Sequence, residues 1–336
     1  MLPKLSVRLH GGMDPRDCIA LAACAEASGF ASLWFAENPF NRGVLPAAAA
    51  CAAATERIGI GIGVLNPYNR HPTLIAMEVG ALDQLAQGRA RLGIGSGIAS
   101  ATEGMGLRAD LPLAAVRDAI TIVRAMLAGE EVNYAGKAFS AIKVRLEYKP
   151  LRRELPLLMA ARGDKALALC GRIADGLMIS NMCPVNFTRH AVDRVRRSAH
   201  AAGRPPTAEV IQYVPCAVRG ERAEAYRLAR AALDQMLPAF WSLGRKVPAA
   251  KAALLRADGL SEQDFTRAVE RLRAGATEAL NDRFIAAFAI AGTAQDCLAQ
   301  ARRYGEAGAT ELALAFAGDQ PEADMRYLGE AMRAEP

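Results

Sequence analysis

The sequence is poor in the residues that usually build metal or hydrolytic sites. It has four histidines among 336 residues, and no His-x-x-x-His pair or carboxylate cluster accompanies them. Zinc needs three or four such ligands held together, so we expect no metal site. No Gly-x-Ser-x-Gly segment with a suitably placed histidine occurs, which argues against hydrolysis by a catalytic triad. A Walker A motif is absent as well.

Long apolar runs and clustered charge are also missing. No run reaches the roughly 18 apolar residues of a membrane span, and residues 1–8 lack the architecture of a signal peptide. The seven cysteines form no Cys-x-x-Cys pair and lie mostly in apolar stretches, which is typical of buried free thiols in a reducing compartment. The net charge of +6 comes largely from arginines on predicted helices. We expect a cytoplasmic protein that binds neither nucleic acid nor a membrane.

What the chain does contain is a repeated order of strand, short connection and helix. This order is typical of a parallel sheet with right-handed crossovers. Eight such strands favour an α/β fold of the (β/α)8 barrel type, with a doubly wound sheet as the alternative. Segments near 100–150, with a hairpin around Tyr134, and 236–290 are interpreted as insertions into one domain spanning 1–336. The predicted strands are 5–9, 32–36, 58–64, 92–97, 157–160, 176–180, 209–218 and 311–315.

Two of these strands, within 58–97, alternate branched apolar residues with glycine. Because side chains alternate across a strand, each has one face without side chains. Such a face is unfavourable unless something approaches the backbone closely. One interpretation is a slot for a flat ligand. The other is ordinary packing, in which large side chains from other strands fill the space. The residues alone do not choose between them.

Two loops at the carboxyl ends of predicted strands suit an anion. Gly95-Ser96-Gly97 offers backbone N–H groups and a hydroxyl, and Ala161 to Lys165 opens a helix whose first N–H groups are unpaired. The alternative for the first is a tight turn, and the alternative for the second is a helix capped by Asp164. Ile98 breaks the Gly-x-Gly-x-x-Gly pattern, so a Rossmann site is disfavoured. Phosphate-binding loops without a metal or triad indicate that a cofactor carries the chemistry.

Six segments spread over nearly the whole chain resemble the luciferase-like family of flavin- and deazaflavin-dependent oxidoreductases. The most similar branch holds the F420-dependent methylenetetrahydromethanopterin reductase. The resemblance implies a (β/α)8 barrel that is dimeric or higher. The segments are Ala25-Glu-Ala-Ser-Gly-Phe30 through Trp34-Phe-Ala-Glu37, Gly63-Val-Leu-Asn-Pro-Tyr-Asn-Arg-His-Pro72, Leu82-Asp-Gln-Leu-Ala-Gln-Gly-Arg89, Leu92-Gly-Ile-Gly-Ser-Gly97, Ala174-Asp-Gly176 and Ala289-Ile-Ala-Gly292.

The same resemblance implies a cofactor site for F420 or FMN. The ring system would lie against the third strand, where the family often has a non-proline cis peptide, here Gly63-Val64. Asn66 would contact the ring, and the two anion loops would hold the phosphate. The implied cofactor-binding residues are Gly63, Val64, Asn66, Gly95, Ser96, Gly97, Ala161, Arg162, Gly163 and Ser180.

Three departures from the family pattern bear on catalysis. Asn38 stands where the family often has a histidine, and asparagine cannot shuttle a proton. Arg8 stands where the reductase branch tends to have an acid, and Asp164 follows Gly163 where proline is usual. We assign Glu37 as a proton relay or polariser, with Arg8 and His10 orienting an anionic substrate. Alternatively, Glu37 pairs with a neighbouring arginine and His10 is a satisfied core residue.

Three functions follow. The leading one is hydride transfer between bound F420 or flavin and a small organic substrate, resembling the F420-dependent reductase. The second is an FMNH₂-dependent monooxygenase that uses O₂ and is supplied by a separate flavin reductase. The third is a non-catalytic relative that binds the cofactor or keeps only the barrel.

Overall fold

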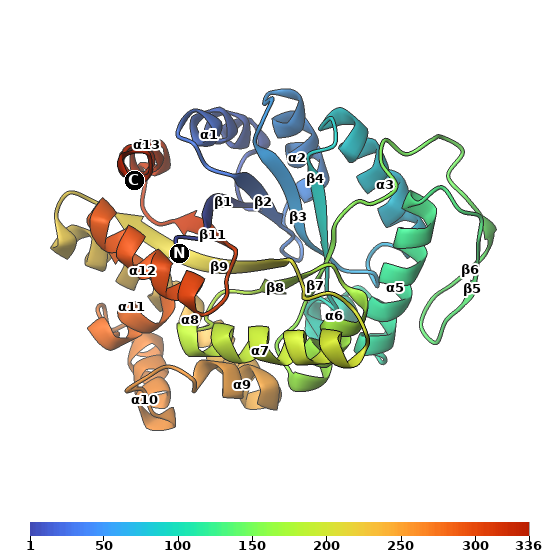
Figure 1. Cartoon of the computed structure of the whole chain (residues 1–336). Coiled ribbons are helices and arrows are strands. Elements are labelled where there is room, and N and C mark those ends of the chain that lie inside the picture. The colour runs from blue at the N-terminus through green and yellow to red at the C-terminus, as the bar shows by residue number, and fades with distance from the viewer. Residues whose placement is uncertain (336) are drawn as a thin grey trace.

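We describe the fold from a computed structural model that places residues 1–335. Eight parallel strands form a continuous sheet, which closes because β9 pairs with both β8 and β11. Closure confirms the predicted barrel and excludes the doubly wound sheet, whose edges would stay open. Figure 1 shows the strands enclosed by helices. The barrel strands are β1 (Lys4–His10), β2 (Ser32–Ala36), β3 (Gly59–Leu65), β4 (Ala90–Ile94), β7 (Leu157–Ala160), β8 (Gly176–Ile179), β9 (Glu209–Val218) and β11 (Glu311–Phe316).

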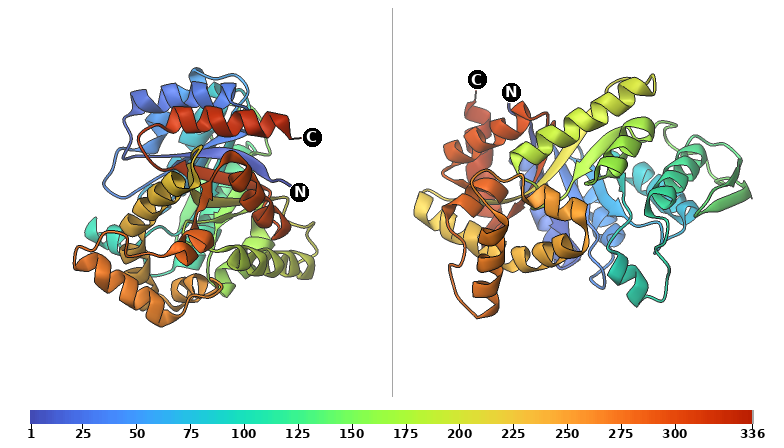
Figure 2. Two further views of the ribbon diagram at one scale, coloured as in Figure 1. Left: turned by 90° about the vertical axis from the view of Figure 1, so that its left-hand side faces the viewer. Right: turned by 90° about the horizontal axis from the view of Figure 1, so that it is seen from below.

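The connecting helices form an outer layer around the barrel (Figure 2). The first begins where the sequence predicts: the Asp14 carboxylate accepts a hydrogen bond from the Arg16 backbone N at 2.9 Å, and Pro15 is the first helical residue. None of the helices within residues 1–335 is long and apolar enough to span a bilayer. The outer helices are α1 (Pro15–Ala27), α2 (Val44–Ala53), α3 (Pro72–Leu85), α5 (Pro112–Leu127), α6 (Asp164–Ile173), α7 (Val185–Ala201), α8 (Arg222–Lys246), α12 (Ala294–Glu306) and α13 (Pro321–Ala334).

Both predicted insertions are present, with one refinement each. The first contains α4 (Ala99–Gly104) and the predicted hairpin, β5 (Val132–Ala135) with β6 (Ser140–Val144), while α5 between them packs into the outer layer. The second adds α9 (Pro248–Leu254), α10 (Glu262–Arg273) and α11 (Asp282–Phe288) to α8. These helices share an apolar core in which Trp241 stacks on Phe265, with the centres of the two rings 5.1 Å apart. The short strand β10 (Ile290–Gly292), which pairs with β9, was not predicted.

The glycine faces of β3 and β4 point into the barrel, and side chains from other strands fill the space beside them. A Cβ added at Gly61 would overlap the Trp34 ring, and one at Gly93 would overlap the Met178 sulfur. At Gly63 it would overlap Met178 and the Tyr213 hydroxyl. The slot for a flat ligand was therefore the wrong interpretation at these positions. The glycines provide room for large interior residues, because a packed interior leaves few voids.

The amino end of the barrel interior is closed by a buried ionic cluster. Glu311 accepts hydrogen bonds at 2.6 Å from both Ser6 Oγ and Trp34 Nε1, and it pairs with Arg91 at 2.8 Å. Burial raises the pKa of Glu311, but Arg91 and these hydrogen bonds more than offset it and hold the pKa below its usual value. Arg91 also reaches Glu209 at 3.3 Å. Every charge in this cluster has an opposite partner.

Candidate functional site

The two predicted anion loops are neighbours at the carboxyl end of the barrel. Because β4 pairs with β7, the loop Gly95–Gly97 lies beside the loop that runs from Ala161 to Gly163. Gly97 is exposed and has a φ of +67°, which glycine adopts readily. A Cβ there would overlap the Asn66 amide. The strand order predicted from sequence thus brings these two loops together.

The second loop ends at a helix that lacks a side-chain cap. Gly163 is the N-cap of α6, and no side chain accepts a hydrogen bond from the first N–H groups of this helix. These groups carry the positive end of the helix dipole, so they form a suitable place for an anion. The alternative interpretation, a helix capped by Asp164, was wrong. Asp164 lies in the first turn of α6.

Arg162 stands at the same helix terminus. Its guanidinium group donates hydrogen bonds to Ser180 Oγ and, at 3.5 Å, to the Asn181 carbonyl, and it lies 5.5 Å from the centre of the Phe240 ring. These contacts orient the cation without neutralising it. The Asn181 Oδ1 atom beside it is buried and has no hydrogen-bond partner within residues 1–335. Such an orphaned acceptor indicates a missing partner, because buried polar groups are normally paired.

Asp164 does not oppose an anion as strongly as the sequence suggests. Its Oδ1 atom lies 2.9 Å from His190 Nε2 on α7, and the carboxylate is mostly exposed to solvent. The hydrogen bond from His190 is the main cause that lowers the pKa of Asp164. The carboxylate is therefore engaged by α7.

The third strand carries the implied cis peptide. The Gly63–Val64 bond is cis, and the register between β3 and β4 shifts between Gly63 and Leu65. Tyr213 Oη donates a hydrogen bond to the Gly63 carbonyl at 2.6 Å. This tyrosine was not singled out from the sequence, because its partner lies 150 residues away.

Asn66 is largely committed to holding its own loop. Its Nδ2 group donates to Thr102 Oγ1 at 3.1 Å and to Asn69 Oδ1 at 3.2 Å, which uses both amide hydrogens. Its Oδ1 accepts from the Tyr68 backbone N at 3.0 Å. One lone pair of the oxygen remains, so Asn66 can offer a ligand an acceptor only.

Glu37 is paired with an arginine, as the alternative interpretation holds. Arg70 Nη1 lies 3.3 Å from Glu37 Oε1, and Arg70 Nε lies 2.7 Å from Glu78. Both Glu37 and Arg70 keep about a fifth of their side-chain surface exposed, at 18% and 22%. The neighbouring His71 caps α3 through the Thr73 backbone N, which explains its presence before Pro72.

Arg8 and His10 both lie on β1, near its carboxyl end. Arg8 has no ion pair within the described residues 1–335, and its Nε is buried without a hydrogen bond. Its guanidinium carbon lies 5.1 Å from the centre of the Tyr213 ring. His10 Nδ1 accepts a hydrogen bond from the Gly12 backbone N at 3.1 Å. Burial, and next the Arg8 charge, lower the pKa of His10.

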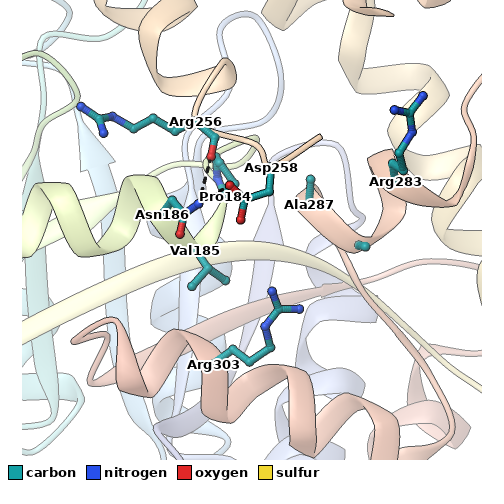
Figure 3. Close-up of a pocket in the computed structure, with 9 residues that line it drawn as sticks. Pro184, Val185, Asn186, Arg256, Asp258, Arg283, Ala287 and Arg303 are labelled. Atoms are coloured by element: carbon teal, nitrogen blue, oxygen red, sulfur yellow. Dashed lines mark hydrogen bonds between the residues drawn. The ribbon is translucent and has the colours of Figure 1, made fainter. Parts of the chain in front are cut away.

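A separate hollow lies outside the barrel mouth, among α7, α11, α12 and the loop after α9. Figure 3 shows Arg303 extending from α12 toward Val185, while Arg256 extends away from the other drawn residues. Asn186 Nδ2 donates to Asp258 Oδ1 at 2.8 Å and closes one side. None of the predicted site residues lines this hollow, and its acid is already paired.

Comparisons with known proteins identify the family of the chain. A family model described as luciferase-like monooxygenase matches residues 1–311. A curated relative, the 5,10-methylenetetrahydromethanopterin reductase of Methanolobus tindarius, is 30% identical over 301 residues, or 87% of each chain.

Solved structures give the same fold. Coenzyme F420 dependent tetrahydromethanopterin reductase from Methanopyrus kandleri superposes with a TM-score of 0.86 at 21% identity, covering 98% of both chains. An F420-dependent secondary alcohol dehydrogenase, solved with an F420–acetone adduct, gives a TM-score of 0.76 at 19% identity over 99% of each.

Proposed function

This chain belongs to the luciferase-like monooxygenase family, and we propose that it is an oxidoreductase that transfers a hydride between bound F420 or flavin and a small organic substrate. The observation that carries the proposal is the uncapped terminus of α6, which lies beside Arg162 and the Gly95–Gly97 loop. This arrangement suits a cofactor phosphate.

The residues present fit such a cofactor. Ala161, Arg162 and Gly163 would hold the phosphate with Gly95, Ser96 and Gly97, and Ser180 would keep Arg162 in place. The bound cofactor would supply or accept the hydride. Because Trp34 and Met178 fill the interior beside β3, its ring system would lie above them, against Val64. The protein would then act mainly by positioning the two reactants.

F420 is the first choice because both solved structures compared above are described as F420 dependent. The relative from Methanolobus tindarius, named a 5,10-methylenetetrahydromethanopterin reductase, aligns over most of both chains and supports a reductase. Asn38 also supports a reductase, since it cannot move a proton as histidine does. The family model's description favours the second candidate, an FMNH₂-dependent monooxygenase supplied by a separate flavin reductase. We further propose a single domain that acts as a homodimer or higher oligomer in the cytoplasm.

Titration of the purified protein with F420 and FMN, each oxidised and reduced, tests this function through the change in cofactor fluorescence. We expect tight binding of F420 and turnover with hydride acceptors or donors. Tight binding of FMNH₂ with oxygen uptake would replace the reductase by the monooxygenase. Cofactor binding without turnover over a broad substrate panel would support the non-catalytic relative, and binding of neither cofactor would refute the proposal.

Glu37 would polarise the substrate or relay a proton, with Arg70 holding its carboxylate at the mouth. We expect Glu37→Gln to lower kcat by about 10²–10⁴-fold, the usual range for a lost general acid or base. Glu78→Gln is a matched control, because it removes the other partner of Arg70. Equal kcat values for the two variants would refute the role of Glu37.

A further inference from the structure

The barrel interior holds an arginine, Arg8, whose charge has no ion-pair partner among the described residues 1–335. Arg8 lies beside Trp34 in the β1–β2 register, so its side chain points into the barrel with the tryptophan. Its Nε is buried, so the partial exposure of the residue belongs to the outer atoms of the guanidinium group. A buried charge is normally paired or bound to a ligand. Arg8 has neither within residues 1–335.

Three carboxylates at the two ends of the barrel are paired with other arginines. Glu311 and Glu209 bind Arg91 at the amino end of the barrel, and Glu37 binds Arg70 at the mouth. The aromatic ring of Tyr213 therefore provides the main stabilising contact to the Arg8 cation. Burial lowers the pKa of Arg8, and Tyr213 opposes this lowering. An arginine nevertheless stays protonated in proteins, so the charge persists.

His10 adds a second donor next to this cation. Its Nδ1 accepts the Gly12 N–H, so the neutral ring carries its proton on Nε2. Burial, and next the Arg8 charge, lower the pKa of His10 and so favour that neutral form. An anion bound beside Arg8 would screen this charge. The two side chains together present donors and no acceptor to the carboxyl end of the barrel.

We infer that the substrate carries an oxyanion group, a carboxylate or a phosphate, and that Arg8 binds this group with His10 beside it. The inference rests on the proposed function, since it names the class of substrate for that site. The planar fork of an arginine suits two oxygens of either group. A cationic substrate is disfavoured, because its charge would face an unpaired guanidinium.

The test is an NMR titration of the full chain labelled at histidine, with acetate and inorganic phosphate as separate probes, in the presence and absence of F420. We expect the His10 resonance to shift saturably with at least one probe and its pKa to rise. Saturation by acetate alone would identify a carboxylate substrate, and saturation by phosphate alone a phosphate ester. Arg8→Met should weaken the binding at least tenfold, and Arg8→Lys should restore part of it.

Arg16→Met is the matched control, because Arg16 is exposed on the adjacent α1 and has no ion pair in the described chain. A thermal melt of each variant separates lost binding from lost folding. If Arg8→Met does not fold, Arg8→Lys still decides, since an altered fork should weaken anion binding without changing F420 affinity. Shifts that do not saturate in the wild type would overturn the inference. So would an anion affinity in the Arg8 variants equal to that of the wild type.

Cofactor titration of the same samples keeps the two proposals apart. Arg8-dependent anion binding without affinity for F420 or FMN supports the anion site and refutes the proposed function. Cofactor binding without an Arg8-dependent anion leaves the proposed function standing and overturns this inference. With an active cofactor, Arg8→Met should raise the KM for a panel of acids and leave the KM for their methyl esters unchanged.

Discussion

The two ends of the barrel interior treat an arginine in opposite ways. At the amino end, Arg91 lies between Glu311 and Glu209, and each polar atom of Glu311 has a close partner. At the carboxyl end, Arg8 contacts the Tyr213 ring and pairs with no carboxylate of the described residues. A buried charge that is paired contributes to the fold, whereas an unpaired one is costly unless a ligand completes it. This difference separates structural from functional groups.

Helices that begin at the carboxyl end of the barrel also differ in their hydrogen-bonding groups. Helix α12 has a complete capping box between Thr293 and Asp296, while α6 has no side-chain cap within the described residues. Asn181 also leaves its Oδ1 unpaired there. The α6 terminus and Asn181 thus leave groups unsatisfied at the carboxyl end, where ligands of barrel enzymes bind. The comparison can be broken at either end, and the four variants below do so from the largest expected effect to the smallest.

Removing the charge of Glu311 tests the amino end. We expect Glu311→Gln to lower the free energy of unfolding by about 3 kcal/mol, because it leaves the mostly buried Arg91 with Glu209 as its one carboxylate partner within the described residues. Glu209→Gln should cost less than about 1 kcal/mol, since its side chain is 34% exposed. Denaturant unfolding measures both. A small effect for Glu311→Gln would mean that the cluster does not stabilise the fold.

Removing the charge of Arg162 tests the carboxyl end. Arg162→Met should raise the Kd for the cofactor by about tenfold to a hundredfold, because a hydrogen bond to a charged group contributes about 1.5–3 kcal/mol. Its effect on unfolding should be small, since the side chain forms no ion pair within the described residues and its hydrogen bonds go to Ser180 and the Asn181 carbonyl. Arg172→Met, at the exposed far end of α6, is the control. Equal affinities would remove Arg162 from the phosphate site.

The interior glycines are the part of the comparison that sequence alone left open. Gly61→Ala should cost about 1–3 kcal/mol of stability, the usual effect of overpacking, because its Cβ would overlap the Trp34 ring. Gly220→Ala is the control, since an added Cβ there meets open space. Thermal and denaturant unfolding measure the difference. Loss of cofactor affinity in Gly61→Ala without destabilisation would restore the flat-slot interpretation.

The barrel itself was predictable because its signals are local. Strand alternation, capping residues and short connections depend on neighbouring residues, and closure follows from eight repeats. The family resemblance implied that Gly95–Gly97 and the Arg162 loop hold one phosphate, and the pairing of β4 with β7 places the two loops side by side. The strand β10 was missed because its three residues are too short for a periodic pattern.

Side-chain pairing was harder to predict because it depends on contacts distant in sequence. Trp34 meets Glu311 across 277 residues, and no local pattern shows that Gly61 makes room for its ring. Whether Glu37 is free or paired depends on where Arg70 points, so both alternatives stayed open until the structure was known. The lack of a partner for Arg8 could not be seen at all without the full set of neighbours.

The smallest expected effect concerns His10. Burial and Arg8 lower its pKa, so the folded protein binds a proton there less readily than the unfolded chain, whose pKa is about 6.5. The contribution of His10 to stability is therefore complete above about pH 6.5, and it is lost as the pH falls toward the pKa of His10 in the folded protein. His10→Gln should reduce the loss of Tm between about pH 8 and pH 5 by at most about 2–4 °C. His200→Gln, at an exposed position on α7, should leave it unchanged. An identical acid response in His10→Gln and the wild type would mean that burial and the Arg8 charge together do not lower the pKa of His10.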